Sequence, residues 1–148
     1  MLTWFFLNKI LTCLNLVIFI PIFPVNSNSN NYYIYIETSS PRTQDDKARL
    51  ISIDIQPTGR SCVTFWYHMY GTNINTLNLY LKQNGRLGTP VWKHQGPLEI
   101  NQWYKAEVDI YSQTVFQLVF EGVRGDGYKG DIALDDISYS YSSCQTSK

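Results

Sequence analysis

Residues 120–139 read FEGVRGDGYKGDIALDDISY, and this stretch decides the fold. Before it, residues 114–121 are apolar at every second position, which is the spacing of a strand with one buried face. A loop rich in glycine follows at residues 122–130, and residues 131–141 are predicted to form the last strand. A phosphate-binding loop would need a helix after these glycines. A strand follows instead, so we interpret them as turn glycines.

The pattern of short strands extends upstream from this stretch to residue 32. Turn signals separate six further runs that are predicted as strands, at residues 32–37, 48–55, 62–70, 77–82, 91–96 and 103–110. Asn84-Gly85 is a strong hairpin signal. Together with the two segments above, about eight short strands predict an all-β fold, a jelly-roll-like antiparallel β-sandwich.

Two of these runs carry more specific expectations. In residues 48–55, Ile51, Ile53 and Ile55 are expected to share one face of a strand. Residues 62–70 are apolar on both faces, which predicts a central strand covered on both sides.

Charge excludes some classes of function. Twelve Lys plus Arg balance twelve Asp plus Glu, so the formal net charge is zero. Binding to nucleic acid or to an anionic membrane surface needs an excess of positive charge. We therefore expect no nucleic-acid partner, and contact with a membrane only through an uncleaved leader or a parent chain that is missing here.

The first residues differ from the rest of the chain. Residues 1–27 carry a single charge, Lys9, and contain a long apolar stretch, so they are predicted to be a signal peptide or an uncleaved signal anchor. A third interpretation is that the leader comes from an incomplete gene model. Residues 28–31 are predicted to be a polar linker. A targeting leader predicts a secreted or membrane-associated cell-surface protein.

The cysteines are consistent with such a compartment. Cys13 lies inside the leader and would leave with it, so Cys62 and Cys144 remain as the only pair. A bridge between them would close a loop of about eighty residues, which the chain-entropy model values at roughly 4–5 kcal/mol.

Two motifs carry a family resemblance. SCVTFWYHMYG, at residues 61–71, and residues 120–139 ahead of Cys144 resemble the MAM domain of meprin-type metalloproteases, neuropilins and receptor tyrosine phosphatases of the mu class. The resemblance covers residues 32–144 and leaves 145–148 as a tail. It implies a non-catalytic jelly roll that serves in adhesion, dimerisation or holding neighbouring domains, and it implies that Cys62 pairs with Cys144.

The chain also departs from the family pattern. Family domains open with a further segment that carries another Cys pair and an acidic motif, and here the apolar leader stands in its place. We therefore expect an N-terminally truncated domain that lacks an edge strand, has lower stability and is more prone to dimerise or aggregate.

Acidic residues near the glycine-rich loop are the first candidate site. The resemblance implies that Asp135 and Asp136 belong to a calcium or sodium site, because some MAM domains bind such an ion and hard cations prefer carboxylate oxygens. In a regular strand these two side chains would point to opposite faces. The alternative is that the acidic side chains accept hydrogen bonds from loop amides.

Two further candidates concern binding. Arg124-Gly125-Asp126 spells an integrin-type adhesion tripeptide. An aromatic stripe at residues 66–70 predicts either a core stack or a platform for sugars. For the platform, Trp92 and Tyr70 are the residues to test.

These observations predict a non-enzymatic extracellular module that mediates protein–protein interaction or cell adhesion, with protein partners or self-association. One alternative is a fragment of a larger multidomain receptor or meprin-like metalloprotease. A second alternative is a glycan-binding jelly roll.

Overall fold

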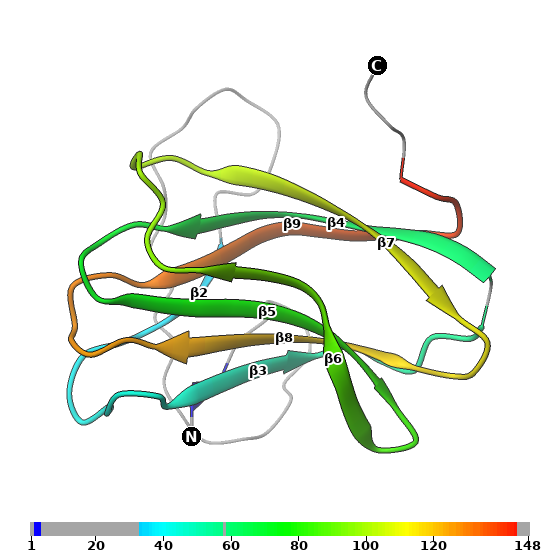
Figure 1. Ribbon diagram of the computed structural model, residues 1–148, viewed down its shortest axis with the longest axis horizontal. Helices are drawn as coiled ribbons and strands as arrows, with labels where there is room; N and C mark the ends of the chain where they lie inside the picture. Colours follow the sequence, from blue (N-terminus) through cyan, green and yellow to red (C-terminus); the bar gives the residue numbers. More distant parts are fainter. Residues whose placement is uncertain (1, 4–32, 58, 145–148) are drawn as a thin grey trace.

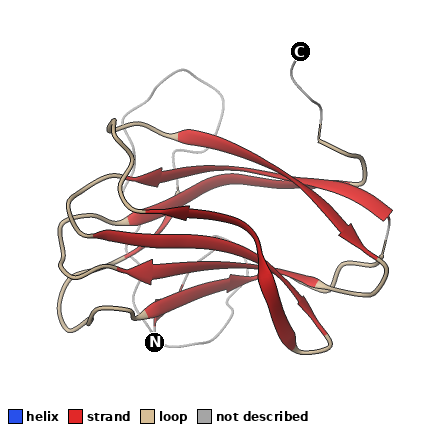
Figure 2. Ribbon diagram, in the orientation of Figure 1, coloured by secondary structure: helices blue, strands red, loops and turns tan. Residues whose placement is uncertain are grey.

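A computed structural model describes residues 2–3, 33–57 and 59–144 (Figure 1). The predicted signal peptide or anchor, the linker and the tail lie almost wholly outside these residues. No helix occurs in the described part, so none there could span a membrane (Figure 2).

The strands form two layers that face each other (Figures 1 and 2). The five-stranded sheet has the order β1-β3-β8-β5-β6 and the four-stranded sheet has the order β2-β9-β4-β7. The bounds are β1 (Leu2–Thr3), β2 (Ile34–Ile36), β3 (Lys47–Ile51), β4 (Gly59–Met69), β5 (Ile74–Gln83), β6 (Arg86–Gln95), β7 (Tyr104–Ser112), β8 (Gln117–Arg124) and β9 (Ile132–Ser140). All pairs are antiparallel except β1 with β3. The predicted all-β sandwich is thus confirmed.

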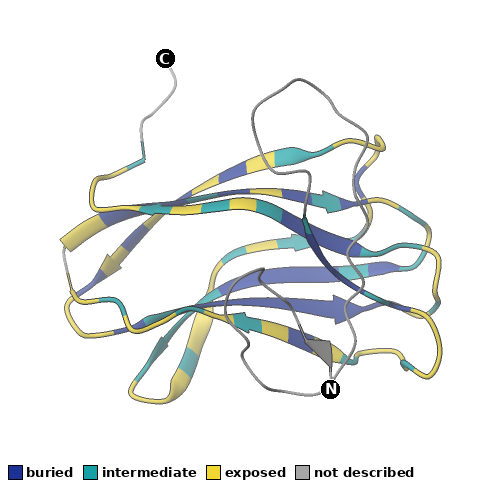
Figure 3. Ribbon diagram, turned by 180° about the vertical axis from the view of Figure 1, so that it is seen from behind, coloured by how far each residue is buried: buried dark blue, intermediate teal, exposed yellow. Residues whose placement is uncertain are grey.

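The core lies between the two sheets. Strand β7 shows why: its even-numbered residues turn inward and its odd-numbered residues turn to solvent (Figure 3). Its inward side chains meet apolar residues of the other strands, and the fully buried ones include Val63, Phe65, Leu77, Leu79 and Leu134. Phe65 contacts both Trp92 and Phe120 edge-on, with ring centroids 5.0 and 4.9 Å apart. Trp92 therefore packs against the core.

The prediction that Ile51, Ile53 and Ile55 share one face of a strand is wrong. Ala48 is fully buried and Leu50 packs against the core, whereas Ile51 and Ile53 are exposed, Ile53 by 84%. Strand β3 ends at Ile51, and Ile55 pairs with Phe116 as an isolated bridge. The inward face is set by pairing with β8, in which Leu50 lies opposite Phe120. Ala48, two residues before Leu50 in β3, also points inward.

Strand β4 holds the central place that was predicted, between β9 and β7. Its outer face is less covered than predicted, because Trp66 is 38% exposed. The Asn84-Gly85 hairpin is confirmed: both residues have positive φ, 49° and 76°, which a two-residue turn of type I′ requires.

A disulfide joins Cys62 in β4 to Cys144, just beyond β9, with the Cα atoms 4.9 Å apart. Cys62 is buried, and the amide of Cys144 donates a hydrogen bond to Asp109 of β7. The bridge therefore fastens the segment that follows β9 to β4, inside the four-stranded sheet.

Candidate functional site

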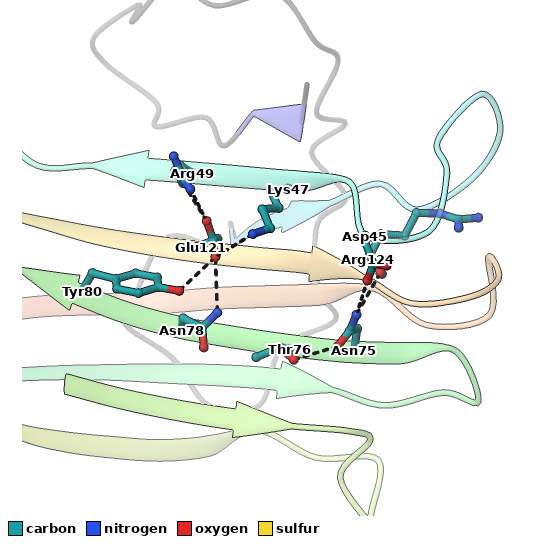
Figure 4. Close-up of polar contacts among 9 residues, drawn as sticks. All are labelled: Asp45, Lys47, Arg49, Asn75, Thr76, Asn78, Tyr80, Glu121 and Arg124. Atoms are coloured by element: carbon teal, nitrogen blue, oxygen red, sulfur yellow. Dashed lines mark hydrogen bonds and ion pairs between the residues drawn. The ribbon is translucent and has the colours of Figure 1, made fainter. Parts of the chain in front are cut away.

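A buried carboxylate is the centre of a polar cluster on the five-stranded sheet (Figure 4). Glu121 of β8 is 1% exposed. Its Oε2 accepts hydrogen bonds from Arg49 of β3, and its Oε1 accepts hydrogen bonds from Tyr80 and Asn78 of β5, at 3.1 and 3.4 Å. Lys47 lies 3.9 Å from the same Oε1. Partners from both neighbouring strands thus compensate this charge, which indicates a structural role.

A second group of polar contacts joins the loops at the end of this sheet (Figure 4). The Asn75 amide donates to the Asp45 carboxylate at 3.0 Å and to the backbone carbonyl of Arg124 at 3.3 Å. The Thr76 hydroxyl donates to the Asn75 carbonyl at 2.7 Å. These bonds hold the loop before β3 against the start of β5 and the end of β8.

The adhesion tripeptide is partly buried. Arg124 is 7% exposed, and its guanidinium donates to the carbonyls of Thr38 and Gly125 at 2.7 and 3.0 Å. Asp126 is exposed and accepts a hydrogen bond from Asn73 at 2.6 Å. Adhesion through residues 124–126 stays a prediction, and the burial of Arg124 weighs against it.

Asp135 and Asp136 sit at an irregularity in β9. Thr64 pairs with Ser138 but Trp66 pairs with Asp135, so β9 carries one extra residue there, and Asp136 has a φ of 46°. This bulge replaces the regular alternation expected for the two residues. The Asp135 carboxylate accepts a hydrogen bond from the Asp136 amide at 2.8 Å. Burial raises the pKa of Asp135, and the charge of Asp136 also raises it.

These carboxylates do not complete a cation shell within the part of the chain that the structure describes. No group of three or more His, Cys, Asp or Glu residues there could hold a metal ion. Asp126 and Asp131 each accept hydrogen bonds from neighbouring loops, from Asn73 and Thr38 respectively. The calcium or sodium site at Asp135 and Asp136 therefore stays a prediction.

A pocket of about 420 Å³ opens on the outer face of the four-stranded sheet. Its lining residues lie near the end of β4 and the starts of β7 and β9. These strand ends are on the left in Figure 1. Its side chains are aromatic and acidic, and the main ones are Tyr33, His68, Tyr70, Trp103, Glu37 and Asp131.

Sequence reasoning found only part of this pocket. His68 and Tyr70 belong to the predicted aromatic stripe, but Trp103 and residues 33–37 were not connected with them. The usable signal was the row of alternate residues Tyr33, Tyr35 and Glu37, which share one face of a strand. Of the two residues named for a sugar platform, Tyr70 lines the pocket and Trp92 does not.

Comparison with known proteins agrees with this fold. Residues 21–145 match the family model described as MAM domain, meprin/A5/mu. The chain is 42% identical over 130 residues to MAM domain-containing glycosylphosphatidylinositol anchor protein 2 of Homo sapiens, which covers 80% of this chain and 14% of that protein. It is 39% identical over 119 residues to thyroid hormone-induced protein B of Xenopus laevis, covering 78% of this chain and 17% of that protein. The chain thus spans about one seventh of the length of such relatives.

Solved structures share the fold at low identity. The K3 cleaved adhesin domain of Lys-gingipain from Porphyromonas gingivalis superposes with a TM-score of 0.60 at 14% identity, with 74% of each chain covered. A family 16 carbohydrate-binding module superposes with a TM-score of 0.51 at 10% identity, covering 83% of this chain and 84% of that one. At these identities the likeness concerns the fold alone.

Proposed function

Because this chain belongs to the MAM domain family, we propose that it acts as a non-catalytic extracellular module that mediates protein–protein interaction or cell adhesion. The observation that carries the proposal is the family match over residues 21–145, which includes every strand from β2 to β9. MAM domains are extracellular, so the chain is placed in a secreted or cell-surface protein. The disulfide is consistent with that compartment.

The architecture suits such a role. Two sheets cross-linked by Cys62–Cys144 form a scaffold whose outer faces and loops can contact other proteins. Exposed large side chains on these surfaces include Trp66, Tyr70, Tyr111, Tyr128 and Tyr141. Aromatic side chains of this kind are enriched where proteins contact each other.

The proposal is tested with the full chain, secreted from a eukaryotic host as an Fc fusion. Beads coated with the fusion are mixed with each other, to detect self-association, and with an array of extracellular proteins. We expect saturable binding to at least one protein partner or to a second copy, and none by Fc alone. A folded fusion that binds neither would contradict the proposal.

The relatives are several times longer than this chain, and what a longer protein would do is a separate proposal. As the alternative, we propose that the module is one domain of a larger receptor or meprin-like metalloprotease. Transcripts that extend the reading frame into such domains would support this alternative, and a secreted product of this length alone would contradict it.

A further inference from the structure

The pocket on the four-stranded sheet is produced by one small residue between two rings. Tyr35 of β2, Ala133 of β9 and His68 of β4 lie opposite one another in register. They therefore form a row across the outer face of the sheet. Because alanine has only a methyl group, the middle of the row is hollow while its two ends carry rings. Ala133 and Tyr35 are both buried, and Tyr33 and Trp103 pack against them.

Further rings stand around these two residues at steep angles to each other. The Tyr33 and Trp103 centroids are 5.5 Å apart with an angle of 73° between the ring planes. His68 and Trp103 are also 5.5 Å apart, at 49°. Rings set at such angles can turn more than one π-face or ring edge toward a single enclosed group.

Two carboxylates, those of Glu37 and Asp131, stand beside the rings. Glu37 and Asp131 adjoin Ile36 and Ile132, the last pair of β2 and β9. Neither carboxylate takes part in an ion pair with residues 33–57 or 59–144. Like charges at such cross-strand positions repel each other.

Asp131 has an oxygen to spare. Both of its hydrogen bonds, from the Thr38 amide at 3.3 Å and the Thr38 hydroxyl at 3.0 Å, end on Oδ1. No described residue donates to Oδ2. Burial raises the pKa of this carboxyl, and the charge of Glu37 raises it further. Burial also raises the pKa of the Tyr33 hydroxyl, and the negative charge of Asp131 raises it further.

We propose that this pocket receives one positively charged side chain, an arginine or lysine, from a protein partner. Aromatic faces attract organic cations, and a partly desolvated carboxylate pair supplies the opposite charge. A cation there would relieve the repulsion between Glu37 and Asp131. The inference rests on the proposed function, because it assumes a protein as the source of the cation.

The test uses the secreted full chain and a pair of probes that differ in charge. N-acetyl-arginine amide carries the guanidinium, and N-acetyl-citrulline amide has nearly the same shape without the charge. The indole N–H signal of Trp103 is followed by NMR during each titration. We expect the arginine probe to shift it with a dissociation constant on the order of 1 mM, and the citrulline probe to bind at least about tenfold more weakly.

Variants locate the effect. Combined Glu37→Gln and Asp131→Asn changes should weaken arginine binding by about tenfold or more. Tyr70→Ala, at a side chain that is 45% exposed and so tolerant of truncation, should weaken it several-fold. The matched control is Trp66→Ala with Asp135→Asn. These two residues also pair a ring with a carboxylate on the same sheet, but they lie outside the pocket. This control should leave binding unchanged.

Equal binding of the arginine and citrulline probes would overturn the inference. So would unchanged arginine binding by folded pocket variants. A third contradicting result would be a shift of the Trp103 signal by neutral oligosaccharides and not by the arginine probe. The bead assay separates this inference from the proposed function. Beads that bind proteins while the arginine probe fails would overturn the pocket alone. Beads that bind no protein would overturn the proposed function, and with it the assignment of the cation to a protein, even if the free probe binds.

Discussion

The Arg49 guanidinium holds the Glu121 carboxylate with two nitrogens, Nη2 at 2.6 Å and Nε at 2.7 Å, both from Oε2. The arginine side chain is 45% exposed, whereas the glutamate side chain is 1% exposed. The Glu121 charge is therefore buried, while its partner Arg49 remains in contact with water. Removing the arginine would leave a buried charge with weaker compensation.

We expect Arg49→Met to lower the free energy of unfolding by about 3 kcal/mol, because it keeps most of the aliphatic stem and strips the buried carboxylate of its main cation. Urea denaturation followed by tryptophan fluorescence measures this change. The matched control is Arg86→Met, at an exposed position of β6, which should change stability by less than about 0.5 kcal/mol. Equal effects of the two substitutions would show that Glu121 does not depend on Arg49.

Some of the fold follows from local sequence and some does not. The alternation of apolar and polar residues predicted β7 and the inner face of β8 correctly, because alternate apolar side chains of both strands point into the core and the charged ones of β7 point to solvent. At residues 48–55 the alternating isoleucines were misleading: β3 ends at Ile51, its inward face is set by pairing with β8, and the small Ala48 is buried. The extra residue of β9 at Asp136 escaped prediction for a related reason, since a bulge depends on the partner strand.

The candidate site shows the same limit more strongly. Glu121 was not singled out, because its partners Arg49 and Tyr80 come from two strands that are remote in sequence. The pocket combines Tyr33, His68 and Trp103, whose proximity depends on the order of strands in the sheet. Spacing along one segment carries no information about that order.

The disulfide gives a second prediction. Replacing Cys62 and Cys144 together by alanine should lower the free energy of unfolding by about 2–5 kcal/mol, because the bridge spans 82 residues and restricts the unfolded chain. Thermal and urea unfolding of the oxidised protein and the double variant measure the difference. Reduction of the unsubstituted protein should reproduce it, and unchanged stability after complete reduction would contradict the prediction.

Calcium gives a third prediction. Since no group of three or more His, Cys, Asp or Glu among residues 33–57 and 59–144 could hold a metal ion, we expect the melting temperature to be the same in calcium and in chelator. An ion that binds the folded state must raise the melting temperature in proportion to its occupancy. Asp135→Asn serves as the control. A calcium-dependent rise that this variant removes would contradict the expectation and establish the site.

The Asp131 carboxyl gives a prediction about pH. Its pKa is raised in the folded protein, chiefly by burial, so the folded state holds a proton at pH values where the unfolded chain has lost it. The contribution of Asp131 to the free energy of unfolding therefore decreases as pH rises from the ordinary aspartate pKa through the raised one. Asp131→Asn removes this titration and keeps an oxygen that can accept the hydrogen bonds from Thr38. We expect the variant to gain stability relative to the parent as pH rises through this range, measured by urea unfolding at a series of pH values. Asp54→Asn, at an exposed position, is the control and should run parallel to the parent. Parallel curves for Asp131→Asn as well would mean that burial does not hold a proton on this carboxyl.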